Sequence, residues 1–213
     1  EWRNNPDGYD NRISTHVIKP FKVPQSWKIY RGFDFGYSRP FSVGWYAVDH
    51  DGRMYRVREL YGCTGIPNEG VRWEPTVIAR KIAEIEKEDV NLRGRRVYGI
   101  ADPSIFDESR GESVAAMMER AGVYFEPGDN TRLAGKMQIH NRLAFDENGI
   151  PMLVYSMTDV EDIDTDGEDH IYDEVRYVAM ARPINPPRAA EKKAQEFNPL
   201  ETAAEVKPYA WWQ

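Results

Sequence analysis

The sequence has 213 residues, of which 41% are hydrophobic, enough for one core of ordinary size. Its net charge of -7 argues against a general nucleic-acid coat protein, which would be basic. No apolar run approaches the roughly 18 residues of a membrane span, and no secretory signal is visible at the start. The single cysteine, Cys63, excludes an internal disulfide framework and fits a reducing compartment.

Residues 1–27 are rich in Asn, Asp, Pro and other polar groups, so we expect a linker or N-terminal arm. Within this arm, residues 16–18 could form one short strand. The sequence begins at Glu1 rather than Met, which suggests a fragment or a processed product. We therefore expect the compact domain to begin after residue 27.

Three strands are expected in succession, at residues 28–35, 41–48 and 54–61. Asp51-Gly52, between the second and the third, is typical of a tight hairpin turn. The connection between the first and the second is also short. The pattern predicts an antiparallel three-strand meander.

Helices and strands then alternate along the chain. Pro75 signals the start of a helix, and Ile78, Ile82 and Ile85 follow at helical spacing. A meander followed by alternating strands and helices describes an α/β sheet with helices on both faces. The later strands are expected at 97–101, 123–125 and 151–155, and the later helices at 113–121, 131–145 and about 168–182.

From Pro183 the sequence changes character, because prolines interrupt stretches of Ala, Glu and Lys. We expect residues 183–213 to form a Pro-rich C-terminal tail that packs loosely or is disordered. Its final Trp211-Trp212 could dock on the core or on a partner. The expected domain is therefore residues 28–182.

Asp34 stands inside an apolar strand, between Phe33 and Phe35. A carboxylate in such a strand is costly to bury unless it is paired or binds a metal. Asp34 could also start a turn, but it lies within the strand rather than after it. This position favours a functional role.

Two further carboxylates have comparable settings. Asp102 ends the apolar strand at 97–101, at the edge where an α/β sheet places its ligands, although Asp before Pro also opens plain turns. Asp173 lies on the last expected helix and shares one face with Asp169. Asp169 could merely cap this helix, and either Asp169 or His170 could assist Asp173.

Asp34, Asp102 and Asp173 together predict a site for hard divalent cations, because carboxylate oxygens are the ligands that Mg²⁺ prefers. Two ions held about 4 Å apart by bridging carboxylates can activate water and stabilise the leaving oxygen in phosphodiester hydrolysis. The sequence therefore predicts metal-dependent phosphodiester chemistry, with two Mg²⁺ or Mn²⁺ ions in the site.

Charge is distributed unevenly along the chain, with acidic residues concentrated at 159–169. A nuclease can be acidic overall if a local basic rim holds the phosphates. Each basic cluster could equally be an ordinary solvated face. The two clusters are Arg93, Arg95 and Arg96, and Arg132, Lys136, His140 and Arg142.

Four segments, taken in order, resemble the C-terminal nuclease domain of the large terminase subunit of tailed bacteriophages. They are residues 32–36 with Pro40 after them, residues 99–104, residues 129–132 with Gly135, and residues 169–177. That family is similar in fold to ribonuclease H and to Holliday-junction resolvases. The resemblance implies a ribonuclease H-like mixed sheet, in which an antiparallel meander is followed by parallel strands and flanked by helices.

The resemblance also implies an endonuclease that cuts concatemeric viral DNA during packaging, in the cytoplasm of the host cell. Full-length terminases carry an N-terminal ATPase, but this sequence has no G-x-x-x-x-G-K-[ST] motif. The implied partners are double-stranded DNA, the terminase ATPase domain, the small terminase subunit and the portal. By resemblance, the metal ligands are Asp34, Asp102 and Asp173, with Asp169 and His170 as possible additions, and the candidate phosphate contacts are Arg132, Lys136 and Arg142.

Three alternatives remain open. A resolvase or transposase of the same fold would prefer branched or otherwise special DNA. A non-catalytic docking domain would show no biochemical defect when Asp34 is replaced by Ala. An actin-like or sugar-kinase-like ATPase would use residues 34–36 as a phosphate loop, but it needs a second Gly-rich loop, which the sequence lacks.

Overall fold

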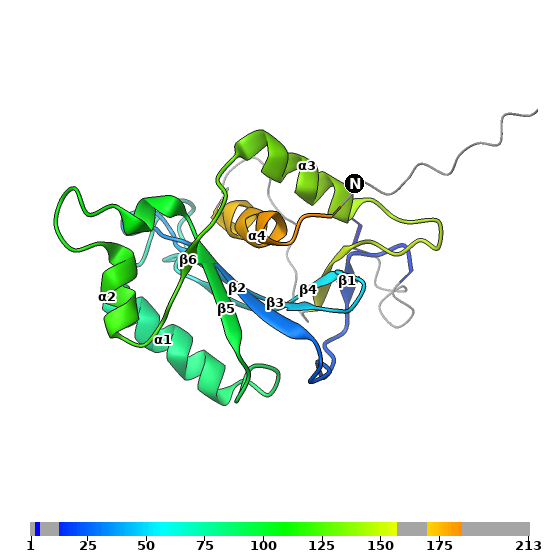
Figure 1. Ribbon diagram of the computed structural model, residues 1–213, viewed down its shortest axis with the longest axis horizontal. Helices are drawn as coiled ribbons and strands as arrows, with labels where there is room; N and C mark the ends of the chain where they lie inside the picture. The colour runs from blue at the N-terminus through cyan, green and yellow to red at the C-terminus, as the bar shows by residue number, and fades with distance from the viewer. Residues whose placement is uncertain (1–2, 5–12, 157–169, 185–213) are drawn as a thin grey trace, which may run out of the picture.

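The computed structural model describes residues 3–4, 13–156 and 170–184, and one mixed sheet runs through them (Figure 1). The strand order is β1-β7-β4-β3-β2-β5-β6. The strands are β1 (Val17–Ile18), β2 (Lys28–Asp34), β3 (Ser42–Val48), β4 (Met54–Tyr61), β5 (Val97–Ala101), β6 (Glu126–Pro127) and β7 (Leu153–Ser156). The helices are α1 (Pro75–Glu88), the 3-10 helix η2 (Pro103–Phe106), α2 (Val114–Arg120), α3 (Arg132–Leu143) and α4 (His170–Ala181).

The centre of the sheet is the predicted meander, in which β2, β3 and β4 pair antiparallel. Gly52 permits the tight turn between β3 and β4, since its φ of +82° suits glycine. On either side the pairing is parallel, with β5 beside β2 and β7 beside β4. The predicted mixed sheet, an antiparallel meander followed by parallel strands, is confirmed.

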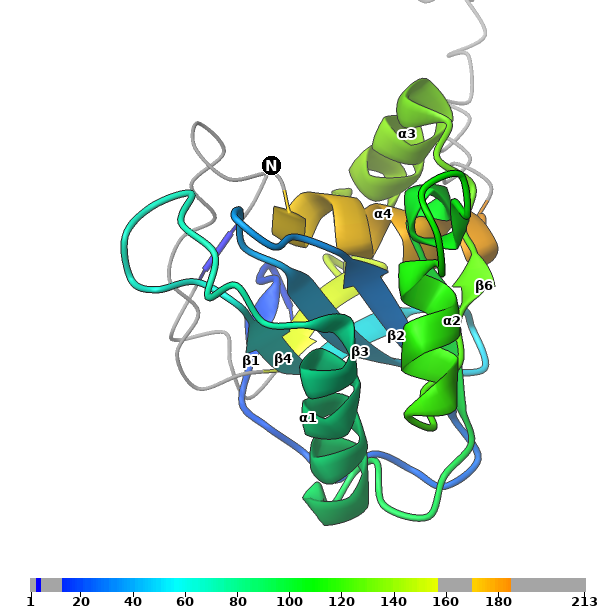
Figure 2. The same ribbon diagram turned by 90° about the vertical axis from the view of Figure 1, so that its left-hand side faces the viewer.

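Helices cover both faces of the sheet. Figures 1 and 2 show α1 and α2 on one face and α4 on the other, with α3 outside α4. Phe33 and Trp45 belong to the core on the α1 side, whereas Tyr46 and Val178 belong to the core beneath α4. No helix in the described ranges is long and apolar enough to cross a membrane.

Most predicted elements agree with the structure to within one or two residues, and β4 and β5 agree residue for residue. The strand predicted at 123–125 is wrong, because pairing with β5 begins only at Glu126. Val123 and Phe125 are buried in the core instead, and Nη2 of Arg31 donates a hydrogen bond to the carbonyl of Tyr124. These apolar residues therefore resemble a strand in the sequence without forming one.

The short strand expected near the N-terminus is confirmed as β1, which pairs parallel with β7 at the edge of the sheet. Both of its residues are buried. The division into an arm at 1–27, a domain at 28–182 and a tail at 183–213 stays a prediction. Of the tail, only residues 183 and 184 lie within the described part of the chain.

Two paired glycines let α4 lie directly on the sheet. Gly32 of β2 and Gly44 of β3 face each other across the ladder. A Cβ on Gly32 would lie 2.6 Å from the main-chain oxygen of Glu174, and a Cβ on Gly44 would lie 2.2 Å from the carboxylate of the same residue. Both approaches are shorter than real Cβ contacts, so glycine is required at both positions.

Glu174 is fully buried beneath α4 and paired within the protein. Its Oε1 accepts hydrogen bonds from Arg56 Nη2 at 2.6 Å and from Tyr46 Oη at 2.8 Å. Burial raises the pKa of Glu174 to about 7, although the nearby Arg56 opposes this effect. The pair joins α4 to β3 and β4, and thereby fixes the position of the helix over the sheet.

We expect Gly32→Ala and Gly44→Ala each to lower the free energy of unfolding by about 1–3 kcal/mol through overpacking. Truncating Glu174 to Ala should relieve the clash at Gly44, where a side chain is the obstacle, but not at Gly32, where the obstacle is main chain. Denaturant unfolding of the two double-mutant cycles measures this difference. Equal coupling in both cycles would contradict the described packing.

Candidate metal centre

Asp34 and Asp102 lie side by side at one edge of the sheet. Phe33 pairs with Ala101 in the parallel ladder between β2 and β5, and each aspartate is the next residue along the chain. The backbone N–H of Asp102 donates to the carbonyl of Phe33 at 3.2 Å. Asp34 and Asp102 are therefore adjacent because each stands at the C-terminal end of its strand and the two strands are parallel neighbours.

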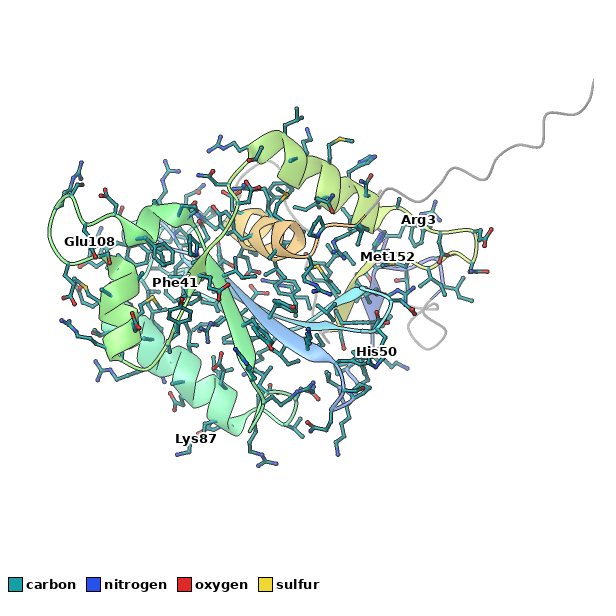
Figure 3. All side chains as sticks on the ribbon, viewed as in Figure 1. Arg3, Phe41, His50, Lys87, Glu108 and Met152 are labelled. Carbon is teal, nitrogen blue, oxygen red and sulfur yellow. The ribbon has the colours of Figure 1, made fainter. Side chains whose placement is uncertain are left out.

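This edge is the end of the sheet away from the β3–β4 hairpin. Asp34 pairs with Ser42, the first residue of β3, whereas His50 lies two residues beyond Val48, the last residue of that strand. Figure 3 labels His50 on one side of the molecule and Glu108, in the loop after η2, on the other. The candidate site belongs to the Glu108 side, while a pocket that includes His50 and Arg182 lies at the hairpin end.

α4 brings the third predicted carboxylate to the same edge and supplies a hydrogen bond to each of the three. Nδ1 of His170 lies 2.9 Å from Oδ2 of Asp34. The Tyr177 hydroxyl donates to Oδ2 of Asp102. Nε of Arg176 donates to Oδ1 of Asp173 at 3.0 Å, and Nη2 lies 2.8 Å from the same oxygen as an ion pair.

The electrostatics show that these carboxylates share one neighbourhood. Burial raises the pKa of Asp34 above 3.8, the negative charges of Asp173 and Asp102 add to this effect, and His170 partly offsets it. Burial would also raise the pKa of Asp102, but hydrogen bonds from Ser104 and Tyr177 outweigh it and lower that pKa. The two strand-end aspartates therefore differ in character, and Asp34 is the harder one to keep ionised.

Carboxylates are the type of ligand that a hard divalent cation prefers, and the cation would neutralise the mutual repulsion of Asp34, Asp102 and Asp173. Within the described ranges, however, no three His, Cys, Asp or Glu side chains are grouped so that they could hold a metal ion. Each of the three carboxylates also has one oxygen hydrogen-bonded to a side chain of α4. The three-carboxylate metal site therefore stays a prediction.

The other predicted site residues have different outcomes. Asp169 lies outside the described residues. His170 is close to Asp34, as expected of a group that assists the site. Arg132 and Lys136 are exposed on α3 and remain candidates for phosphate contacts.

Arg142 does not fit its predicted role. It is fully buried, with Nη1 donating to the carbonyl of Gly52 at 3.0 Å and Nη2 donating to the carbonyl of Arg182. These hydrogen bonds tie α3 to the β3–β4 hairpin and to the end of α4. Arg142 is therefore a structural residue, and we withdraw it from the phosphate contacts.

Three residues of the site region were not singled out from the sequence, namely Glu174, Arg176 and Tyr177. All three lie among buried apolar residues of α4. Tyr177 had a usable signal, since it lies one helical turn after Asp173 and so shares its face. The sequence gave no such signal for Arg176 and Glu174. Their side chains are buried where Gly135 leaves room for Arg176 and Gly44 leaves room for Glu174.

A scan of protein-family models and a search of curated proteins gave no match. Solved structures do match. The large terminase from a thermophilic bacteriophage, in complex with ADP, superposes with a TM-score of 0.56 at 19% identity, over 77% of this chain and 41% of that one. The P22 large terminase nuclease domain superposes with a TM-score of 0.52 at 14% identity, over 81% of this chain and 88% of that one.

These matches confirm the predicted fold class. The described chain has the ribonuclease H-like fold of large-terminase nuclease domains, with the mixed sheet flanked by helices. It covers two fifths of the length of the terminase from the thermophilic phage but most of the P22 nuclease domain. At these identities the likeness concerns the fold, and the activity remains to be argued from the site.

The raised pKa of Asp34 predicts a pH-dependent cost to stability. Folding favours the protonated carboxyl, so the folded protein binds more protons than the unfolded one as pH rises above 3.8, and stability falls through that range. We expect Asp34→Asn, which cannot ionise, to unfold at a higher temperature than the wild type at pH 7. Thermal unfolding across pH 3–8 measures this, and the advantage of the variant should shrink towards pH 3.

Asp51→Asn, in the exposed hairpin turn, is the matched control. It should not share the pH-dependent gain. A lower midpoint for Asp34→Asn at pH 7 would mean that the interaction with His170 outweighs the cost of burial.

Proposed function

We propose that this chain is the nuclease domain of a phage large terminase, a metal-dependent endonuclease that cuts concatemeric viral DNA during packaging. The observation that carries the proposal is that Asp34 and Asp102 stand at neighbouring strand ends of a ribonuclease H-like sheet, with Asp173 near enough for its charge to raise the pKa of Asp34. Carboxylates gathered in this way from distant segments suit hard-cation chemistry better than a purely structural role. The matches to terminase structures support the assignment.

In the proposed site, Asp34, Asp102 and Asp173 hold two Mg²⁺ or Mn²⁺ ions, with His170 or Asp169 as possible additional ligands. When bound, the ions supply an activated water and neutralise charge on the scissile phosphate. The chain itself supplies the orientation. β2 and β5 fix Asp34 and Asp102 next to each other, and α4 brings Asp173 to them.

His170 has a second possible task, since it lies within hydrogen-bond distance of Asp34. An imidazole held by a carboxylate can accept or return a proton near neutral pH. In this role Nδ1 of His170 would exchange a proton with Asp34, since Nε2 of the ring is buried. Both tasks need the ring where α4 places it.

Arg132 and Lys136 are the proposed contacts for the DNA backbone. Both are exposed on α3, which packs outside α4 (Figure 2). Two phosphate contacts on a chain of net charge -7 predict weak and salt-sensitive binding to isolated DNA. The partners that we propose by analogy are the terminase ATPase domain, the small terminase subunit and the portal, in the cytoplasm of the host cell.

The first test is cutting of supercoiled plasmid with Mn²⁺, Mg²⁺ or EDTA. We expect nicking and linearisation that need the metal and fall by at least about 100-fold in Asp34→Ala, because the variant lacks one of the proposed ligands. Asp51→Ala, on the hairpin at the other end of the sheet, should cut like the wild type. Equal cutting by wild type and Asp34→Ala would reject the assigned site, and preference for branched DNA would favour a resolvase.

A second test concerns the phosphate contacts. The double variant Arg132→Ala with Lys136→Ala should bind duplex DNA more weakly and reduce the slope of log K against log salt by about 2. Fluorescence anisotropy over a range of salt concentrations measures that slope. The matched control, Arg80→Ala with Lys87→Ala, removes the same charge from exposed positions of α1 on the opposite face of the sheet. An equal loss of slope in both would mean that α3 has no special part in binding.

A further inference from the structure

Arg176 is a buried cation within the carboxylate cluster. Its side chain is 3% exposed, Nε donates to Oδ1 of Asp173 at 3.0 Å, and Nη2 lies 2.8 Å from the same oxygen as an ion pair. Nη2 also donates to the Tyr177 hydroxyl at 3.2 Å, and that hydroxyl donates to Asp102. A continuous set of hydrogen bonds therefore connects Asp173 to Asp102 through Arg176 and Tyr177.

The neighbouring helix is shaped to receive this arginine. A Cβ on Gly135, near the start of α3, would lie 2.4 Å from Cγ of Arg176 and 2.5 Å from Cδ. Glycine inside a helix costs up to about 1 kcal/mol relative to alanine. Gly135 thus provides the space in which the stem of Arg176 lies.

The position of the guanidinium is not explained by hydrogen bonding alone. Nη1 of Arg176 is buried and has no hydrogen-bond partner among the described residues. Leaving a charged donor unpaired in the interior is costly. The compensation is electrostatic, because Asp173 and Asp102 are both close to the positive charge.

We propose that Arg176 is the internal counter-cation of this cluster, a positioning residue that holds Asp173 and, through Tyr177, Asp102, and that lowers the affinity of the site for divalent cations. The inference rests on the proposed function, because it takes the cluster to be a metal site. A fixed positive charge repels an incoming divalent ion, while the carboxylates that it holds must be shared with that ion. Removing the charge should therefore tighten metal binding, which the loss of a purely structural contact would not do.

The test is calorimetric titration of the protein with Mn²⁺ in the absence of DNA, so that the readout is affinity rather than cutting. We expect Arg176→Gln to bind Mn²⁺ about tenfold more tightly, the order that Coulomb's law gives for one charge near a divalent ion in a hydrated site. Arg176→Lys keeps the charge but loses the planar fork, and its affinity should stay near the wild-type value. Arg80→Gln, on the opposite face of the sheet, removes an exposed charge and should change nothing.

Unchanged or weaker Mn²⁺ binding by folded Arg176→Gln would overturn the inference. If that variant does not fold, Arg176→Met decides, because it removes the charge and keeps an unbranched stem in the space that Gly135 leaves. Tighter Mn²⁺ binding by Arg176→Met would support the inference, and wild-type affinity would overturn it. Mn²⁺ binding to the wild type that is lost in Asp34→Ala but unchanged in Arg176→Gln rejects this inference alone. Absence of Mn²⁺ binding to both the wild type and Arg176→Gln rejects the proposed metal site with it.

Discussion

The close contact between α4 and the sheet at Gly32 and Gly44 determines the geometry of the candidate site. These glycines face each other on adjacent strands, and Glu174 of α4 packs against both, with its main-chain oxygen at Gly32 and its carboxylate at Gly44. Because α4 carries Asp173 together with the donors to Asp34 and Asp102, its height above the sheet decides which groups meet. A helix raised by one methyl group at either position would carry all of these groups away from the strand ends.

The buried pair of Glu174 and Arg56 fixes α4 along the strands as well as above them. A buried ion pair is weak evidence for stability, because desolvation of both charges offsets much of their attraction, and the pKa of Glu174 rises to about 7 under that cost. The clearer consequence of this pair is that it fixes the position of α4 along the direction of the strands. A slip of α4 by one turn, about 5.4 Å, would separate the carboxylate from Arg56 and Tyr46 and leave charges buried without partners.

The strand-end part of the site was predictable from the sequence, and the helical part was predictable only in outline. Asp102 was expected at the end of its strand, whereas Asp34 was expected inside its strand and is the last residue of β2. Parallel pairing of β2 and β5 is enough to place the two together. Arg142 was misassigned because its charge was given more weight than its spacing. It lies on the same face of α3 as Gly135 and Ile139, which are both buried. Glu174 and Arg176 could not be placed, since a buried charge is recognisable only once its partner and the space around it are known.

The contacts of α4 describe a cluster in which each carboxylate already has a partner inside the chain. His170, Arg176 and Tyr177 each contact one of the three carboxylates, and all three partners come from the same helix. A cation entering such a site competes with the existing hydrogen bonds to the carboxylates. The free energy of cation binding is therefore the difference between the cation-bound and the hydrogen-bonded arrangements. Phosphate oxygens from a DNA strand add ligands that the protein does not supply. In the proposed nuclease, metal binding and DNA binding would therefore reinforce each other, and the same helix that assembles the site would restrain it until DNA arrives.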